Sequence, residues 1–575
     1  MNNLKDLFRK TAGLKGTASF ADAQKDPSTN FLNDADPVTE EKTGQLLGLF
    51  NVLRTLTDET TTAPPEVNES ESTLTSIQTE FVAKDDNPLI LLHFILQQAD
   101  STEHAIIAVK QFLEKSVTGK KMVLELLDLL LLIDAELEHR LMIEYLYAAY
   151  SIDVETQNTT LKPLLIEWQQ MLTSIAREEM GHLISVQNVR KSLGLNIYFN
   201  VKYLSELTRI FPYISQLEPF SKTSLAKYIF AESPPKWIES DDPNAIRVRQ
   251  LLDAEIGSED NKLTNDVDSL REYVTQYGYP ISALFKVMLF ILEHLTTEDD
   301  FKIASVTQQA KPEQWNRGYT SDERSVNING TVHKMTASNV LVETAMTRWE
   351  CVQAIQAVAE QGENANEDTV YTDETTHFNR FLKIFKYWDS HEGSDFNPSK
   401  NMATNPYVGE DTDLTKGTEH TKIEDPLTQK WARLFNLRYN LLLTFIEHSF
   451  HIETNCPNPS SSFKGLVINN SFGEMYNLKA LSHVISGLKM STTHDLLAGP
   501  PFQIHPIQEK RYLNVVKEKA TYTDYPALYR TFIEDSKDLI QTIPDHETIA
   551  FLNTMQNADQ ELLALLPNQQ STAVL

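Results

Sequence analysis

The stretch from Trp168 to Val189 constrains this chain most. It contains no proline, and its apolar residues recur at helical spacing, which predicts an amphipathic helix. Glu179 and His182 lie three residues apart on the apolar face of that helix. A carboxylate and an imidazole in an apolar stripe need a partner, because an unpaired polar group is costly to bury. A metal ion suits the pair best, since Glu-x-x-His facing into a helix bundle is half of a dinuclear carboxylate site.

The composition excludes several classes of function. The chain has 575 residues, with 51 Lys and Arg against 80 Asp and Glu, for a net charge of −29. No basic stripe is left to neutralise phosphates, so we expect no nucleic-acid binding and no docking on anionic membranes. The sequence also lacks a phosphate-binding glycine loop, a Gly-x-Ser-x-Gly turn and a His-Glu-x-x-His motif.

The number of cysteines and the length of the apolar runs indicate the cellular compartment. Only Cys351 and Cys456 occur, so a disulfide framework is excluded. We interpret Cys351 as a buried structural thiol inside a helix. No apolar run reaches the roughly 20 residues that span a bilayer, and the first residues lack an apolar signal core. The expectation is a cytoplasmic protein.

Three regions follow from the composition along the chain. Residues 1–86 are acidic and polar and are expected to be largely disordered, with one short helix near 44–56. Residues 87–395 are expected to form a helical bundle, interrupted by a long crossover at 195–335 that holds its own helices and covers one side. Residues 396–575 are expected to form a C-terminal helical region.

Two helical hairpins are predicted within the bundle. A long apolar helix over 122–151 and the central helix are joined by a short loop, so Glu138 is expected opposite Glu179. The second hairpin is expected to pair a helix over 340–360 with one that begins near Thr372 or Asp373. That second helix carries Glu374 and His377, another Glu-x-x-His on an apolar face.

The candidate metal ligands combine carboxylates and imidazoles in the order that a dinuclear bundle site requires. They are Glu138, Glu179, His182, Glu360, Glu363, Glu374 and His377. Glu360 and Glu363 are alternatives for the third helix, and Glu350 is a further one, because Glu360 stands only 14 residues before Glu374. Such oxygen and nitrogen ligands suit two iron ions, or manganese. Arg177 and Asn188 are expected to orient the ligands.

Several stretches resemble the ferritin-like family typified by iminophenyl-pyruvate dimer synthase. They are Glu138-His139, Ile175-Ala-Arg-Glu-Glu-Met-Gly-His182, Glu360-Gln-Gly-Glu363 and His377-Phe-Asn-Arg-Phe381, with weaker matches at Phe230-Ala-Glu-Ser-Pro234, Asn405-Pro406 and Ala498-Gly-Pro-Pro-Phe502. The resemblance implies an all-α protein, a ferritin-like four-helix bundle with additional N- and C-terminal helices. It carries ligand roles onto Glu138, Glu179, His182, Glu360 and His377, and less firmly onto Glu363 and Glu374.

Two positions depart from the family pattern. Ile143-Glu144 stands where Pro-Pro is common, and Gly181 replaces a bulkier residue beside His182. Both changes are expected to touch the substrate pocket. In some members of the family, two imines derived from an aromatic amino acid are oxidatively coupled.

The preferred hypothesis is therefore a metal-dependent oxidoreductase. Its dinuclear iron carboxylate site would oxidise or couple a small organic substrate, such as an amino-acid-derived one. The alternative is a non-catalytic ferritin-like scaffold that binds a protein partner or forms a homo-oligomer. Tight metal binding with oxygen-dependent turnover separates the two hypotheses.

Overall fold

The computed structural model describes residues 119–199, 215–238, 240–258, 285, 287–301, 308–315, 324–328, 331–335, 340–363, 376–391, 396–409, 420–452, 462–493, 495–508, 524–544 and 548–566. The predictions for residues 1–86 lie outside this set. The described part is built almost entirely from helices, which confirms the predicted all-α class. None of the described helices has the length and apolar character needed to cross a membrane.

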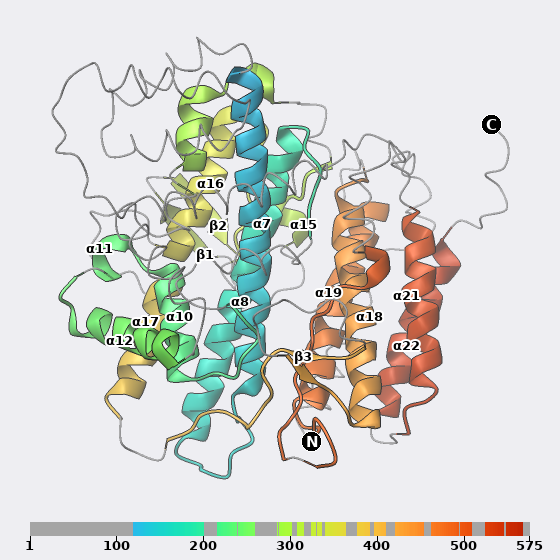
Figure 1. Ribbon diagram of the computed structural model, residues 1–575. Helices are drawn as coiled ribbons and strands as arrows, with labels where there is room; N and C mark the ends of the chain where they lie inside the picture. The colour runs from blue at the N-terminus through green and yellow to red at the C-terminus, as the bar shows by residue number, and fades with distance from the viewer. Residues whose placement is uncertain are drawn as a thin grey trace, which may run out of the picture.

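Two long antiparallel helices form the centre of the molecule. They are α7 (Gly119–Ser151) and α8 (Lys162–Ser192), which lie against each other in Figure 1. Proline in the first turn of α8 fits that position, where a backbone N–H would have no partner. Gly194 follows α8 with a φ of 71°, a left-handed conformation that glycine adopts without strain. The predicted hairpin is present.

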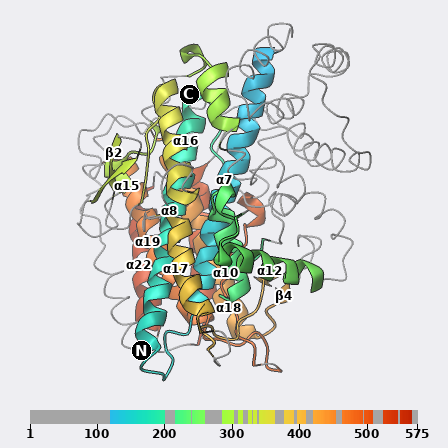
Figure 2. The same ribbon diagram turned by 90° about the vertical axis from the view of Figure 1, so that its left-hand side faces the viewer.

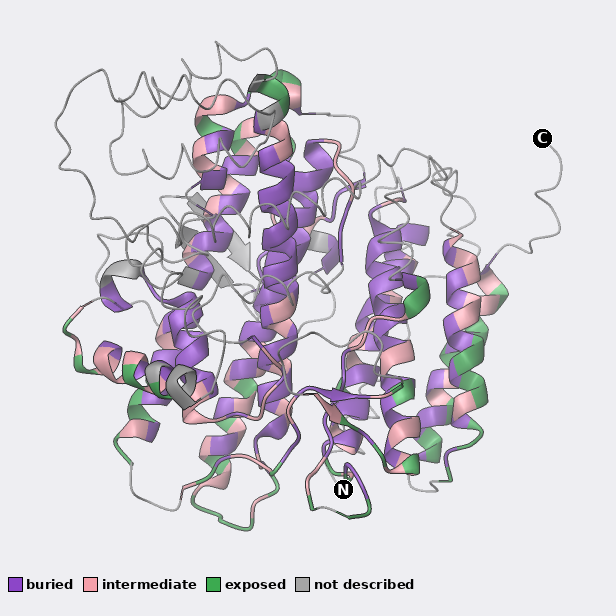
Figure 3. Cartoon of the chain, in the orientation of Figure 1, coloured by how far each residue is buried: buried purple, intermediate pink, exposed green. Residues whose placement is uncertain are grey.

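Two shorter helices lie end to end along α8 and run in the same direction as each other. They are α16 (Arg348–Glu363) and α17 (His377–Asp389), and both lie beside α8 in Figure 2. The predicted second hairpin is therefore wrong, because Ala345, Gln361, His377 and Lys383 contact Ser192, His182, Glu178 and Glu167 of α8 in turn. With these helices beside it, every residue of α8 from Glu178 to Ser192 is buried. Figure 3 shows the same burial along α7. Because α8 is enclosed on all sides, each of its polar side chains requires a partner inside the protein.

The crossover covers one side of the bundle. Its helix α10 (Lys222–Glu232) packs against α17 and against α12 (Pro243–Ser258). Ser221 caps α10 by accepting from the Ser224 N–H, and the helix stops just before Ser233-Pro234. The smaller elements are α11 (Pro235–Ile238), η3 (Ile291–Leu295), η4 (Glu298–Asp300), α15 (Pro312–Trp315) and the antiparallel pair β1 (Arg324–Ile328) and β2 (Thr331–Met335).

The segment before α16 differs from its prediction. A helix was expected from residue 340, but α16 begins at Arg348. Residues 340–345 instead bond to α8: Ser185 Oγ accepts from the Glu343 N–H at 2.9 Å, and Asn188 Nδ2 donates to the Glu343 carbonyl at 2.7 Å. These bonds to another helix replace the bonds that a continuous helix would make within itself.

Gly181 and Asn188 serve this close contact. A Cβ at Gly181 would lie 2.3 Å from the carbonyl oxygen of Leu341, so only glycine lets the segment approach α8. The expectation that Gly181 shapes the pocket is therefore replaced by a packing role. Asn188 holds the main chain of Ala310 and Glu343, which differs from the ligand-orienting role expected for it.

The C-terminal helices stand beside the bundle, to the right of α7 in Figure 1. They are α18 (Pro426–Ser449), α19 (Phe463–Ile485), α21 (Tyr525–Ile540) and α22 (Ile549–Leu565), with a two-residue parallel pair formed by β3 (Pro406–Tyr407) and β4 (Thr421–Lys422). Tyr439 of α18 bonds to His139 of α7, with 2.5 Å between Oη and Nε2. Trp431 is buried in the core, as is Cys351, in line with the sequence interpretation.

Candidate metal centre

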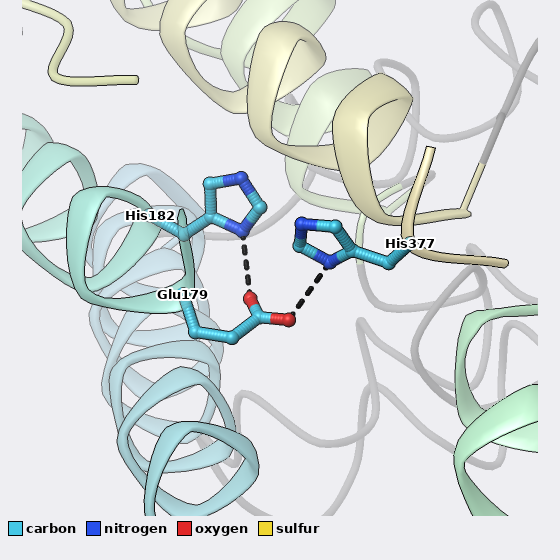
Figure 4. Close-up of side chains that lie close together, drawn as sticks. All are labelled: Glu179, His182 and His377. Atoms are coloured by element: carbon cyan, nitrogen blue, oxygen red, sulfur yellow. Dashed lines mark hydrogen bonds and ion pairs between the residues drawn. The ribbon is translucent and has the colours of Figure 1, made fainter. Parts of the chain in front are cut away.

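Glu179 lies between two histidines from different helices (Figure 4). Its Oε2 is 2.9 Å from Nδ1 of His182, one turn later on α8, and its Oε1 is 2.8 Å from Nδ1 of His377 on α17. The two rings are stacked with centroids 5.3 Å apart. One ligand atom from each residue lies within 4.8 Å of the others, which makes this group a candidate to hold a metal ion.

Two more carboxylates extend the site on either side. Glu138 Oε2, from α7, is 3.3 Å from Nδ1 of His182. Glu232 Oε2, from the last residue of α10, is 3.6 Å from Nδ1 of His377. Each histidine thus faces one outer carboxylate and one oxygen of the shared Glu179. We refer to Glu138, Glu179, His182, Glu232 and His377 as the metal-centre residues.

The metal-centre residues are deeply buried and incompletely bonded. None is more than 5% exposed. Glu138 Oε2, Glu179 Oε1 and His377 Nδ1 lie within ion-pair distance of their neighbours, yet none of the three makes a well-directed hydrogen bond to any described residue. Buried polar atoms are rarely left in this state unless an ion or water completes the site.

The charges of the metal-centre residues are strongly perturbed. Burial raises the pKa of Glu138 well above its usual value. Burial would lower the pKa of His182, but Glu138 and Glu179 outweigh it and raise that pKa to about 10. Burial would also raise the pKa of Glu179, but His377 and His182 hold it well below its ordinary value. In the metal-free protein the histidines are therefore protonated. Their protons occupy the positions that a metal cation would take.

Outer partners set which nitrogen of each histidine faces the site. His377 Nε2 is 3.0 Å from Glu178 Oε2, and His182 Nε2 is 2.9 Å from Gln361 Oε1. Both oxygens are acceptors, so each Nε2 carries the donated hydrogen, and each Nδ1 faces the carboxylates, where it would become a ligand once a metal displaces its proton. Tyr145 Oη donates to Glu232 Oε1 at 2.6 Å and orients that carboxylate.

A glycine lies beside Glu232 and His377. A Cβ at Gly362 of α16 would lie 3.0 Å from Glu232 Oε2 and 4.0 Å from His377 Nδ1. The lack of a side chain here lets α16 lie close to both ligand atoms. The incompletely bonded oxygens and nitrogen and the mixed carboxylate and imidazole donors are compatible with a bound metal.

The structure brings together four of the predicted ligands, Glu138, Glu179, His182 and His377. Glu360 is half-buried and accepts a hydrogen bond from Gln356 of its own helix at 3.1 Å. Glu350 accepts from the N–H groups of Met346 and Thr347 and caps α16. The Glu363 side chain and all of Glu374 lie outside the described residues.

Three residues at the site were not among the predicted ligands or their partners. Glu232 comes from the crossover, and its signal was the Phe230-Ala-Glu-Ser-Pro234 stretch, which was matched without being given a role. Glu178 directly precedes Glu179, and Gln361 directly follows Glu360. Both are buried because α8 and α16 are enclosed on more than one face.

The family comparison agrees with this architecture. A sequence model of the family described as ferritin-like matches residues 132–386. The matched segment begins in α7, ends in α17 and contains all the metal-centre residues. The ferritin-like fold of the bundle is thereby shown. No curated protein and no solved structure matched the chain.

Proposed function

We propose that the ferritin-like bundle of residues 132–386 holds two metal ions and acts as an oxidoreductase on a small organic substrate. One observation carries the proposal. The two oxygens of Glu179 face two histidines, and each histidine faces a further carboxylate. A shared carboxylate between two similar ligand groups is the arrangement that a pair of ions requires.

The residues divide into two ligand groups. Glu138, His182 and Glu179 Oε2 would hold one ion, and Glu232, His377 and Glu179 Oε1 would hold the other. Carboxylate oxygens with one imidazole each favour iron, with manganese as the alternative. When bound, an iron pair supplies oxygen-dependent oxidation chemistry.

The chain itself contributes orientation and exclusion of water. Glu178 holds the hydrogen on His377 Nε2, and Tyr145 Oη holds Glu232 through Oε1. The near-complete burial of the metal-centre residues keeps bulk water away, which strengthens electrostatic interactions inside the site. The substrate class rests on the resemblance to the family typified by iminophenyl-pyruvate dimer synthase, which supports an amino-acid-derived amine or imine.

The first test is the metal content of the protein. After anaerobic incubation with ferrous iron and removal of unbound metal, elemental analysis is expected to give about two irons per chain. The double change Glu179→Ala and His182→Ala is expected to remove them. Glu167→Gln is the matched control, because Glu167 is on the same helix but away from the metal-centre residues. Its side chain is exposed, and its Oε1 lies 3.7 Å from Nζ of the exposed Lys383. A metal-free wild-type protein after this treatment would disprove the proposal.

The second test separates an enzyme from a scaffold. Oxygen uptake is measured for the iron-loaded protein with a panel of aromatic amino acids and their imines. Oxygen consumption that requires both substrate and Glu179 supports the oxidoreductase. Bound iron without any substrate-dependent oxygen uptake would favour the non-catalytic scaffold instead.

A further inference from the structure

We infer that the two ligand groups are unequal, and that the group of His377 and Glu232 binds a divalent metal ion more tightly than the group of His182 and Glu138. This inference rests on the proposed function and adds an order of loading to it. The difference arises from the residues behind the ligands, which are not alike on the two sides.

His377 has a charged and firmly held outer partner. Its Nε2 is 3.0 Å from Glu178 Oε2, and Glu178 is completely buried. Arg380, one turn after His377, donates to Glu178 through both terminal nitrogens, with Nη1 at 3.0 Å from Oε1. A carboxylate that accepts from an imidazole N–H makes the opposite nitrogen a stronger ligand.

Ser174 adds a further bond to the same partner. Its Oγ donates to Glu178 Oε1 at 3.1 Å, from one turn earlier on α8. Glu178 is therefore fixed by α8 and α17 together, and it fixes the His377 ring in turn. Charge-assisted bonds of this kind are stronger than bonds between neutral groups.

His182 has a neutral outer partner. Its Nε2 is 2.9 Å from the amide oxygen of Gln361 on α16. An amide is a weaker acceptor than a carboxylate, so it increases the basicity of the ring less. The two histidines thus present the same Nδ1 to the site but with different strength as ligands.

The outer carboxylates differ in the same direction. Glu232 Oε1 accepts from Tyr145 at 2.6 Å, which leaves Oε2 aimed at His377. Glu138 accepts no comparable bond from a tyrosine or another outer residue among the described residues, and its Oε2 lies 3.3 Å from Nδ1 of His182. A ligand that is already oriented loses less side-chain entropy when the ion binds. On the His377 side, the absence of a Cβ at Gly362 leaves Glu232 Oε2 without a steric contact at 3.0 Å.

An anaerobic titration with cobalt(II) tests the inference, because this ion reports its ligands through visible absorption. The wild-type protein is expected to bind two equivalents in two separate phases. Glu178→Gln is expected to weaken the tighter phase about 10–100-fold and to leave the weaker phase unchanged. Gln361→Glu supplies the missing carboxylate and is expected to strengthen the weaker phase.

A glycine pair provides the matched control. Gly362→Ala places a methyl group 3.0 Å from Glu232 Oε2, so it is expected to displace that ligand and to weaken the tighter phase selectively. Gly473→Ala, on α19, places a methyl group where no atom lies within 4 Å and is expected to change neither phase. Circular dichroism and the melting temperature of each metal-free variant show whether it has folded.

Two results would overturn the inference. One is a single phase of two equivalents in the wild-type protein. The other is a change in Glu178→Gln or Gly362→Ala that affects both phases equally or only the weaker one. Absence of any cobalt binding by the wild-type protein is a different result, because it would overturn the proposed function as well.

Discussion

Two buried ionic clusters in this protein are built on opposite plans. The metal-centre residues place three carboxylates and two histidines between α7, α8, α10 and α17. The second cluster joins Arg438 of α18, Glu474 of α19 and Asp559 of α22. Both lie among packed helices, but only the first leaves oxygen and nitrogen atoms incompletely bonded.

The Arg438 cluster is complete in itself. Nε of Arg438 donates to Glu474 at 2.8 Å, and its two terminal nitrogens donate to Asp559 at 2.9 Å each, with a further bond to Glu474. Burial would lower the pKa of Arg438, but the two carboxylates outweigh it and raise the pKa. The planar guanidinium matches two carboxylates at once, so no ion is needed.

The comparison separates a structural cluster from a binding cluster. A permanently charged arginine donates to every carboxylate oxygen around it. Histidines and surplus carboxylates leave polar atoms that a metal ion would bind. Burial and charge alone do not distinguish the two, because both clusters have them. What distinguishes the two clusters is whether each buried polar atom has a hydrogen-bond partner, and this criterion is testable.

The largest expected effect is on the Arg438 cluster. Arg438→Ala is expected to destabilise the protein by about 3–5 kcal/mol, because it leaves two buried carboxylates without a cation. Chemical denaturation measures the loss. Glu179→Gln in the metal-free protein is expected to cost less, since His182 and His377 are able to release their protons and arginine is not. Equal losses in the two variants would contradict the comparison.

Metal binding is expected to stabilise the protein through the metal-centre residues and not through the Arg438 cluster. At an iron concentration about 100 times the dissociation constant, binding to the folded state adds about 2.7 kcal/mol to the free energy of unfolding. A chelator should lower the melting temperature of the loaded wild-type protein. The chelator should not change the melting temperature of the double variant Glu179→Ala and His182→Ala. A chelator response in this double variant would place the bound metal elsewhere.

Two tyrosine changes of similar size sharpen the contrast. Tyr145→Phe removes the bond to Glu232, and Tyr529→Phe removes a 2.6 Å bond to His448 among the C-terminal helices. Each is expected to cost about 1–2 kcal/mol of stability. Only Tyr145→Phe is expected to weaken cobalt binding, measured by titration. Weakened binding in Tyr529→Phe would mean that the two regions are coupled.

An effect that depends on pH is expected at Lys464, a buried amine held by the carbonyls of Gln308 and Gln309. Burial, with help from Lys311 and Lys191, lowers its pKa to about 7 from the ordinary value of 10.5. Between these values the unfolded chain binds more protons, so stability rises with pH, by at most about 1.4 kcal/mol per pH unit. Urea denaturation at pH 7 to 10 measures this slope, which Lys464→Met should lose.

Local patterns predicted much of the bundle. The helical spacing around Glu179, the proline that starts α8 and the glycine that follows it are all visible within short windows. The fold class and the hairpin of α7 and α8 followed from them. The start of α16 did not, because residues 340–345 bond to α8, which lies about 160 positions away in the chain.

The choice between neighbouring residues was also beyond the sequence. Glu360 and Gln361 differ by one position, which is a rotation of about 100° around a helix axis. The structure directs Gln361 to His182 and leaves Glu360 half-buried with Gln356. A periodic pattern cannot resolve this rotation when α16 has buried residues on most of its faces.

The sequence by itself determined that Glu179 and His182 share one face of a helix, since helical geometry depends only on the spacing of residues. Only the tertiary structure decided that Glu232 would join them. Its helix α10 lies in the crossover and reaches His377 because it packs against α17. Contacts between distant segments depend on how whole helices pack, and no short window of sequence records that packing.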